Sequence, residues 1–154
     1  SRKQPKVDLD LGCCFRLTTG EQGVIQPLGA RFGAKHGPPY IYLDKDDRSG
    51  AASDGENLYI MRPDLIDKVV VFAMIYEGTA NFSHVKGRMK LKEEGNEIDI
   101  HLTNPDPALS FCAVAMIKKD KDAIVISKEE RYFLNHLFCD LHYEYGFRWA
   151  AGAK

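Results

Sequence analysis

The residues best suited to chemistry lie in segment 44–57, which reads DKDDRSGAASDGEN and holds five carboxylates among fourteen positions. Crowded carboxylates repel one another, and the interrupting Lys45 and Arg48 do not relieve that repulsion. Calcium relieves it, because this ion takes about 6 to 8 oxygen ligands from carboxylates, amides, backbone carbonyls and water. The candidate ligands among its oxygen-donating side chains are Asp44, Asp46, Asp47, Ser49, Asp54, Glu56 and Asn57. The segment therefore predicts a calcium site.

The spacing of these residues differs from that of an EF-hand. With Asp44 as the first loop position, Arg48 stands fifth and Ser49 sixth, where the EF-hand has a glycine. Gly55 stands twelfth, where a bidentate glutamate belongs. A loop rich in Asp, Gly and Ser is also typical of a solvated turn whose side chains bond their own backbone. From the residues alone, a metal site and a plain turn both remain open.

Two further carboxylates precede this segment on a predicted strand. Residues 7–17 read VDLDLGCCFRL, in which apolar positions alternate with Asp8, Asp10, Gly12, Cys14 and Arg16. That period of two predicts a half-buried strand with the second set on its exposed face. Asp8 and Asp10 then lie about 7 Å apart on that face. They would join the acidic cluster if segment 44–57 folds over it, and they are otherwise typical of exposed strand residues.

The remaining patterns predict many short strands and one helix. Segments 40–43 and 58–61 are apolar strands that flank the acidic segment, and 69–76 is an apolar run suited to a central strand. Residues 84–102 and 110–127 each predict a hairpin. Leu134, Leu137, Phe138 and Leu141 recur at helical spacing near the C-terminus. We therefore expect a mainly β fold, an antiparallel β-sandwich with one short C-terminal helix.

Length and composition limit the classes of function. A chain of 154 residues predicts one domain over residues 7–154, after a polar lead-in over residues 1–6 whose first residue is not Met. The formal charge of −1 offers no global field for nucleic acid or an anionic membrane. No apolar run approaches the roughly 20 residues of a membrane span, which excludes direct membrane insertion. The four cysteines lack zinc-site spacing, so we expect reduced thiols and a cytoplasmic protein.

Catalytic patterns are weak. The histidines are scattered, and the chain has neither a nucleophile elbow nor a phosphate-binding loop. The adjacent thiols of Cys13 and Cys14 are a conceivable chemical target. However, Cys13 alternates inward with apolar residues, which favours a small core side chain. We therefore do not expect an enzyme.

A family resemblance adds to these patterns. The combination of VDLDLGCCFRL, LDKDDRSGAASDGENLYI and VVVFAMIYEG resembles the TerD-type tellurium resistance and stress-response family. The opening DLDLGC, the element PPYIYLDKDDRSG and the ending YEYGFRWAAGAK look closest to its TerA-like branch. In that branch such a domain often lies within a longer protein. The likeness covers nearly the whole chain.

The resemblance implies a calcium-binding β-sandwich that is not an enzyme. It matches Asp8 and Asp10 to the family's Asp-Leu-Asp strand, and 46–50, Asp54 and Glu56 to its acidic loop. It also implies cytoplasmic proteins of a stress and tellurium resistance system as partners, including a membrane protein of the TerC type. We thus expect a calcium-binding interaction module, with a metal-independent protein-interaction domain of the same system as the alternative. Ala51 and Ala52 replace acidic residues of many relatives, so fewer charged ligands are available.

Overall fold

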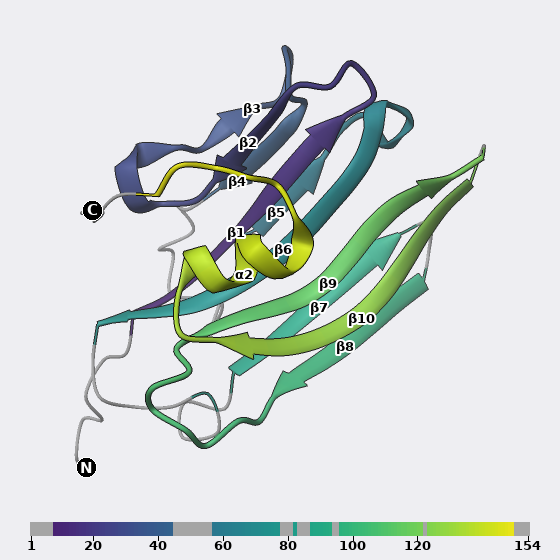
Figure 1. Ribbon diagram of the computed structural model, residues 1–154. Coiled ribbons are helices and arrows are strands. Elements are labelled where there is room, and N and C mark those ends of the chain that lie inside the picture. The colour runs from purple at the N-terminus through teal and green to yellow at the C-terminus, as the bar shows by residue number, and fades with distance from the viewer. Residues whose placement is uncertain are drawn as a thin grey trace.

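The computed structural model describes residues 8–44, 57–77, 82, 87–93, 96–121 and 123–149 (Figure 1). Ten strands and one α-helix follow one another in this part of the chain. The strands are β1 (Asp8–Leu17), β2 (Gln22–Ile25), β3 (Gly33–Ala34), β4 (Ile41–Asp44), β5 (Asn57–Ile60), β6 (Ile66–Glu77), β7 (Gly87–Glu93), β8 (Asn96–Leu102), β9 (Phe111–Asp120) and β10 (Ala123–Phe133). The helix is α2 (His136–Tyr143), and two 3-10 turns, η1 (Leu28–Ala30) and η2 (Pro63–Leu65), join strands.

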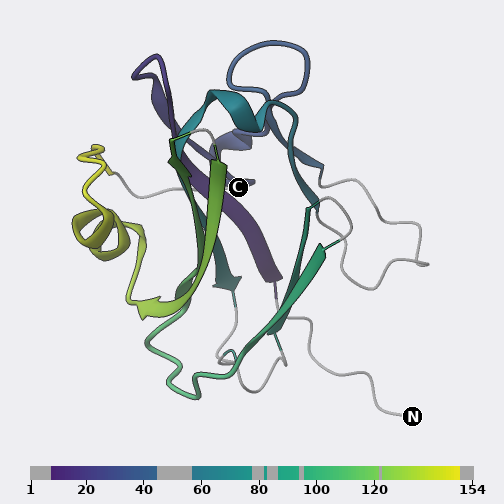
Figure 2. The ribbon, with the colours of Figure 1, turned by 90° about the vertical axis from the view of Figure 1, so that its right-hand side faces the viewer.

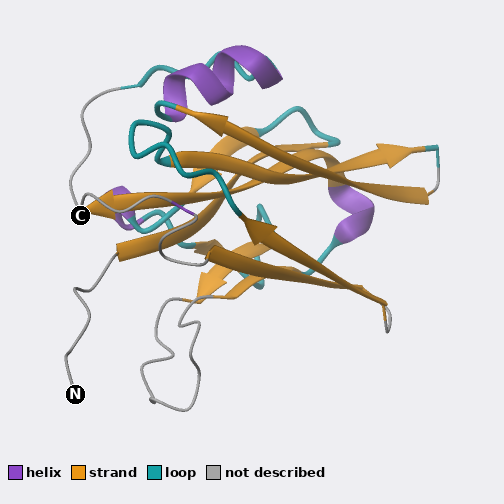
Figure 3. Ribbon diagram, turned by 90° about the horizontal axis from the view of Figure 1, so that it is seen from below, coloured by secondary structure: helices purple, strands orange, loops and turns teal. Residues whose placement is uncertain are grey.

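All described strand pairs are antiparallel, and they form three sheets. The largest sheet has five strands in the order β10-β9-β6-β1-β2. A three-stranded sheet, β3-β4-β5, and the β7-β8 hairpin form a second β layer over one face of the large sheet (Figure 2). Helix α2 lies over the opposite face (Figure 3). The predicted antiparallel β-sandwich with one short C-terminal helix is therefore confirmed.

The two β layers enclose most of the core. Cys13, Phe15 and Leu17 of β1 pack with Ile41 and Leu43 of β4. Under the β7-β8 hairpin, a second cluster joins Ile100 and Leu102 of β8 to residues of β6 and β9. The period of two in β1 and β4 thus gives each strand one face for this core.

The second face of β1 is also buried, contrary to the prediction that this strand is half-buried. Cys14 is 3% exposed and packs with Val70, Cys139, Tyr143 and Tyr145. The alternation in β1 is typical of a half-buried strand because the residues on its second face are small or polar and not large and apolar. Burial of both faces makes β1, like β6, a central strand.

Helix α2 begins at a well-capped end. The Asn135 side chain accepts hydrogen bonds from the backbone N–H groups of Leu137 and Phe138. The sequence predicts the helix correctly but not its buried side. Leu134, Leu137, Phe138 and Leu141 are between 43% and 64% exposed, whereas Cys139, Asp140 and Tyr143 are buried.

Strand β10 is irregular and forms one edge of the large sheet. Its pairing with β9 shifts between Lys128 and Arg131, and Glu130 adopts a positive φ of 45°. Glu129 and Glu130 of β10 therefore lie opposite the single residue Val114 of β9, as in a β-bulge.

Candidate metal-binding site and the sheet faces around it

The two ends of the acidic segment are held opposite each other. Asp44 is the last residue of β4, Asn57 is the first residue of β5, and the two are register partners. Antiparallel partners of this kind lie about 5 Å apart at Cα. Strand pairing therefore brings together the first and last of the predicted ligands of segment 44–57. The other predicted ligands lie outside the described residues: Asp46, Asp47, Ser49, Asp54 and Glu56.

Asp44 and Asn57 lie on the outer face of the small sheet. Ile41 and Leu43 of β4 are buried in the core, so alternation places Tyr42 and Asp44 on the side away from it. That face carries a basic and aromatic contact, because Lys35 Nζ lies 5.1 Å from the ring centroid of Tyr42.

Asp10 does not lie near Asp44. Its register partner on β6 is Met74, which packs on the α2 side of the large sheet. Asp10 is 2% exposed, so the predicted exposed position is wrong. A buried carboxylate requires hydrogen bonds or a cation, because transfer of its charge out of water is costly. Since the small sheet covers the opposite face, Asp10 and Asp44 belong to different faces of the sandwich.

Asp8 begins β1 opposite Glu77. The structure does not describe the side chain of Asp8, so its assignment as a ligand stays a prediction. Within the described residues, no group of three or more His, Cys, Asp or Glu side chains is arranged to hold a metal. The calcium hypothesis therefore depends on segment 44–57.

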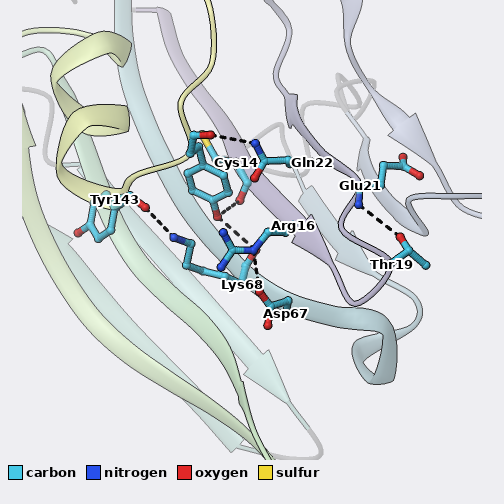
Figure 4. Close-up of polar contacts among 9 residues, drawn as sticks. Cys14, Arg16, Thr19, Glu21, Gln22, Asp67, Lys68 and Tyr143 are labelled. Atoms are coloured by element: carbon cyan, nitrogen blue, oxygen red, sulfur yellow. Dashed lines mark hydrogen bonds and ion pairs between the residues drawn. The ribbon is translucent and has the colours of Figure 1, made fainter.

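A second polar cluster, which the sequence did not indicate, lies at the C-terminal end of α2 (Figure 4). Lys68 Nζ donates to the carbonyl oxygen of Tyr143 over 2.6 Å and lies 4.5 Å from the ring centroid of Tyr145. A cation at this helix end is favourable because the last carbonyls carry partial negative charge. Next to it, Arg16 Nε donates to Asp67 Oδ2 over 2.6 Å.

Tyr145 ties the segment after α2 to the sheet. Its hydroxyl lies 3.1 Å from the carbonyl oxygen of Cys14 and 3.2 Å from that of Lys68. The Gln22 side-chain amide donates to the Tyr145 carbonyl over 2.9 Å. Burial raises the pKa of Tyr145 well above its usual range, so the hydroxyl remains a donor. The aromatic residues after α2 thus cover β1 and β6.

Asp140 organises the same segment from within the helix. One carboxylate oxygen accepts from the backbone N–H groups of Tyr145 and Gly146, at 2.9 and 2.8 Å. The other accepts from the backbone N–H of Phe147 and from the Trp149 indole N–H, both at 2.8 Å. Asp140 is 4% exposed, and these four bonds offset the cost of burying its charge. Its role is therefore structural.

The four thiols are unsuited to nucleophilic chemistry. Cys13, Cys14, Cys112 and Cys139 are free and buried. Burial raises the pKa of Cys13 and Cys14 well above the usual range and that of Cys112 and Cys139 to about 12. Because the thiolate is the reactive form, these groups are poor nucleophiles. The prediction that Cys13 is a core residue is confirmed, since it is fully buried.

Among the histidines in the described part of the chain, His136 has a clearly shifted pKa. Its ring lies between aromatic neighbours, with centroid distances of 4.7 Å to Phe111 and 5.0 Å to Trp149. Its Nε2 is 2.6 Å from Gln26 Oε1. Burial lowers the pKa of His136 from 6.5 to about 4, so the ring is neutral at pH 7.

Comparison with known proteins gives one informative match. The tellurium resistance protein TerA from an Alcaligenes species is 34% identical to this chain over 151 residues. The chain is related to Ter-type tellurium resistance proteins. The predicted family resemblance is thereby confirmed over nearly the whole chain, since the match covers 96% of its residues.

The relative is longer than this chain, which spans 44% of the length of TerA. No family model and no solved structure matches the chain. The described residues contain no helix that is long and apolar enough to cross a membrane.

Proposed function

We propose that this Ter-type domain is a calcium-binding, non-catalytic interaction module of a tellurium resistance and stress-response system. The match to TerA is the observation that carries the assignment to such a system. The calcium component is supported by the five carboxylates of segment 44–57 and by the pairing of its end residues, Asp44 and Asn57. Closure of the segment by strand pairing lowers the entropic cost of gathering ligands from its two ends.

The partners follow from the same assignment. We place the domain in the cytoplasm, where it binds other proteins of the resistance system, including a TerC-type membrane protein. The buried thiols and the neutral, half-buried His136 give no support to a catalytic role. In this proposal the calcium ion bound by segment 44–57 supports partner binding.

Thermal melting with calcium and with chelator tests the ion. A ligand that binds only the folded state at about 100 times its Kd stabilises it by about 2.7 kcal/mol. For a chain of this size that is a rise of roughly 5 to 10 °C in Tm. The double variant Asp46→Asn plus Asp47→Asn is expected to lose the rise.

The matched control is Asp106→Asn plus Asp120→Asn, which removes two carboxylates outside the segment. It is expected to keep the calcium-dependent rise. An unchanged Tm of the unsubstituted protein at millimolar calcium contradicts the metal site.

The second candidate is a metal-independent protein-interaction domain of the same system. One observation favours it: Leu137, Phe138 and Leu141 of α2 are exposed apolar side chains, as is Leu134 just before the helix. Exposed apolar patches of this kind are typical of protein contact sites. Partner binding that survives chelator and the Asp46→Asn plus Asp47→Asn substitutions would select this candidate.

A further inference from the structure

Three cations lie in one row across the α2 side of the large sheet. Arg16 on β1 is the register partner of Lys68 on β6, and Lys68 is the partner of Lys118 on β9. Cross-strand partners project to the same face, and adjacent strands are about 4.8 Å apart. The row therefore holds three positive charges within a span of about 10 Å at Cα. Like charges that face each other across strands destabilise a sheet.

Contacts with neighbouring groups fix two of the three side chains. Asp67 holds the Nε of Arg16, and the Tyr143 carbonyl holds the Nζ of Lys68 above the Tyr145 ring (Figure 4). Each contact uses one donor of a side chain that has several. Cations held in this way bind an anion at a reduced entropic cost.

The third cation, Lys118, is exposed at the end of the row. In the part of the chain that the structure describes, no hydrogen bond or ion pair is formed by its ammonium group. The pKa of Lys68 is lowered, first by burial and then by the charges of Arg16 and Lys118. Asp67 and Glu144 act in the opposite direction. Among the charged groups that act on Lys68, two are cations and two are carboxylates, so with Lys68 itself positive charge is in excess at that position.

We propose that Arg16, Lys68 and Lys118 form a binding site for a small, doubly charged oxyanion. A guanidinium group binds two oxygens of such an ion in parallel, and ammonium groups contact the others as point charges. The anion relieves the repulsion within the row. The site lies on the opposite face of the large sheet from β4 and β5, so it is separate from the proposed calcium site and goes beyond the proposed function.

The test is an NMR titration of the unsubstituted protein with inorganic phosphate, at an ionic strength held constant with sodium chloride. Tellurite is titrated in a parallel arm, because the relative's name points to that element. Saturable changes at the backbone amides of Arg16, Lys68, Lys118 and Tyr145 are expected with at least one of the two oxyanions. If only tellurite binds, the site is selective for it; if both bind, it takes oxyanions as a class.

The variant Arg16→Gln plus Lys118→Gln leaves Lys68 in place at the helix end and is expected to weaken binding about tenfold or more. Its matched control is Lys119→Gln, which removes a cation from the opposite face of β9 and keeps the affinity. A melting curve that matches that of the unsubstituted protein shows that the double variant is folded. The proposal is overturned if neither oxyanion gives saturable changes, if chloride reproduces them, or if the folded double variant binds equally well.

Discussion

Protonation of His136 provides the most quantitative test of the packing between α2 and the sheet. The unfolded chain carries this histidine with a pKa of about 6.5, whereas burial lowers the pKa to about 4 in the folded protein. Between these values the unfolded state binds the proton more readily, so stability falls as the pH falls. The linkage relation gives a loss of about 2 kcal/mol between pH 7.5 and pH 5 from this residue alone.

Urea unfolding at several pH values between 7.5 and 5 measures this loss. His136→Gln removes the titrating ring, so its free energy of unfolding is expected to fall by about 2 kcal/mol less than that of the unsubstituted protein. The other four histidines are common to both proteins and cancel in the comparison.

Val70→Ala is the control for a general loss of stability. It creates a cavity in the core cluster between α2 and the large sheet and retains His136. It is expected to show the full pH dependence of the unsubstituted protein. Equal pH dependence in His136→Gln and the unsubstituted protein would refute the reasoning, as would an NMR titration of the folded His136 ring near pH 6.5.

Two further substitutions test the cover of β1 and the segment after α2. Gly12→Ala would place a methyl group against the Ile25 carbonyl and 2.7 Å from the Phe72 ring, so we expect a loss of about 2 to 3 kcal/mol in urea unfolding. Gly37→Ala, whose methyl group would meet no atom within 4 Å, is the near-neutral control, and equal stability of the two variants would contradict this packing. Asp140→Asn turns an amide N–H₂ toward two N–H donors, and we expect a loss of about 3 to 5 kcal/mol together with a changed Trp149 emission. A loss below about 1 kcal/mol would show that the carboxylate does not hold the segment.

The β-strands were predictable because their signal is local. Periods of two in β1 and the apolar runs of β4, β5 and β6 identify strands without knowledge of their neighbours. The local pattern does not show which elements cover each face of these strands. The second face of β1 is buried by Tyr145 and α2, more than 120 positions along the chain from Cys14. No local pattern in residues 7–17 contains that information.

The helix shows the same limit in another form. Apolar spacing at Leu134, Leu137, Phe138 and Leu141 indicates a helix, and the natural assumption is that this stripe faces the core. The structure instead buries Asp140, because its carboxylate binds the N–H groups of the residues that follow. That bonding pattern rotates the apolar stripe toward solvent. The hydrophobic periodicity of the sequence carries no information about these hydrogen bonds.

The two candidate sites differ in how much of each can be predicted from the sequence. Segment 44–57 is identified by composition alone, and its calcium ligands stay a prediction. The row of Arg16, Lys68 and Lys118 depends on the registers of β1 with β6 and of β6 with β9. A shift of one residue in either register would move a cation to the other face. Three residues from three distant strands give no signal until the sheet is assembled.

The bulge in β10 has a consequence for behaviour at high concentration. An uninterrupted edge strand of eleven residues would present a template on which further chains could assemble. The extra residue near Glu130 breaks the regular spacing of its outward N–H and C=O groups, and the run Lys128, Glu129, Glu130, Arg131 adds charge at the same place. This local irregularity protects the protein against fibre-like aggregation along that edge.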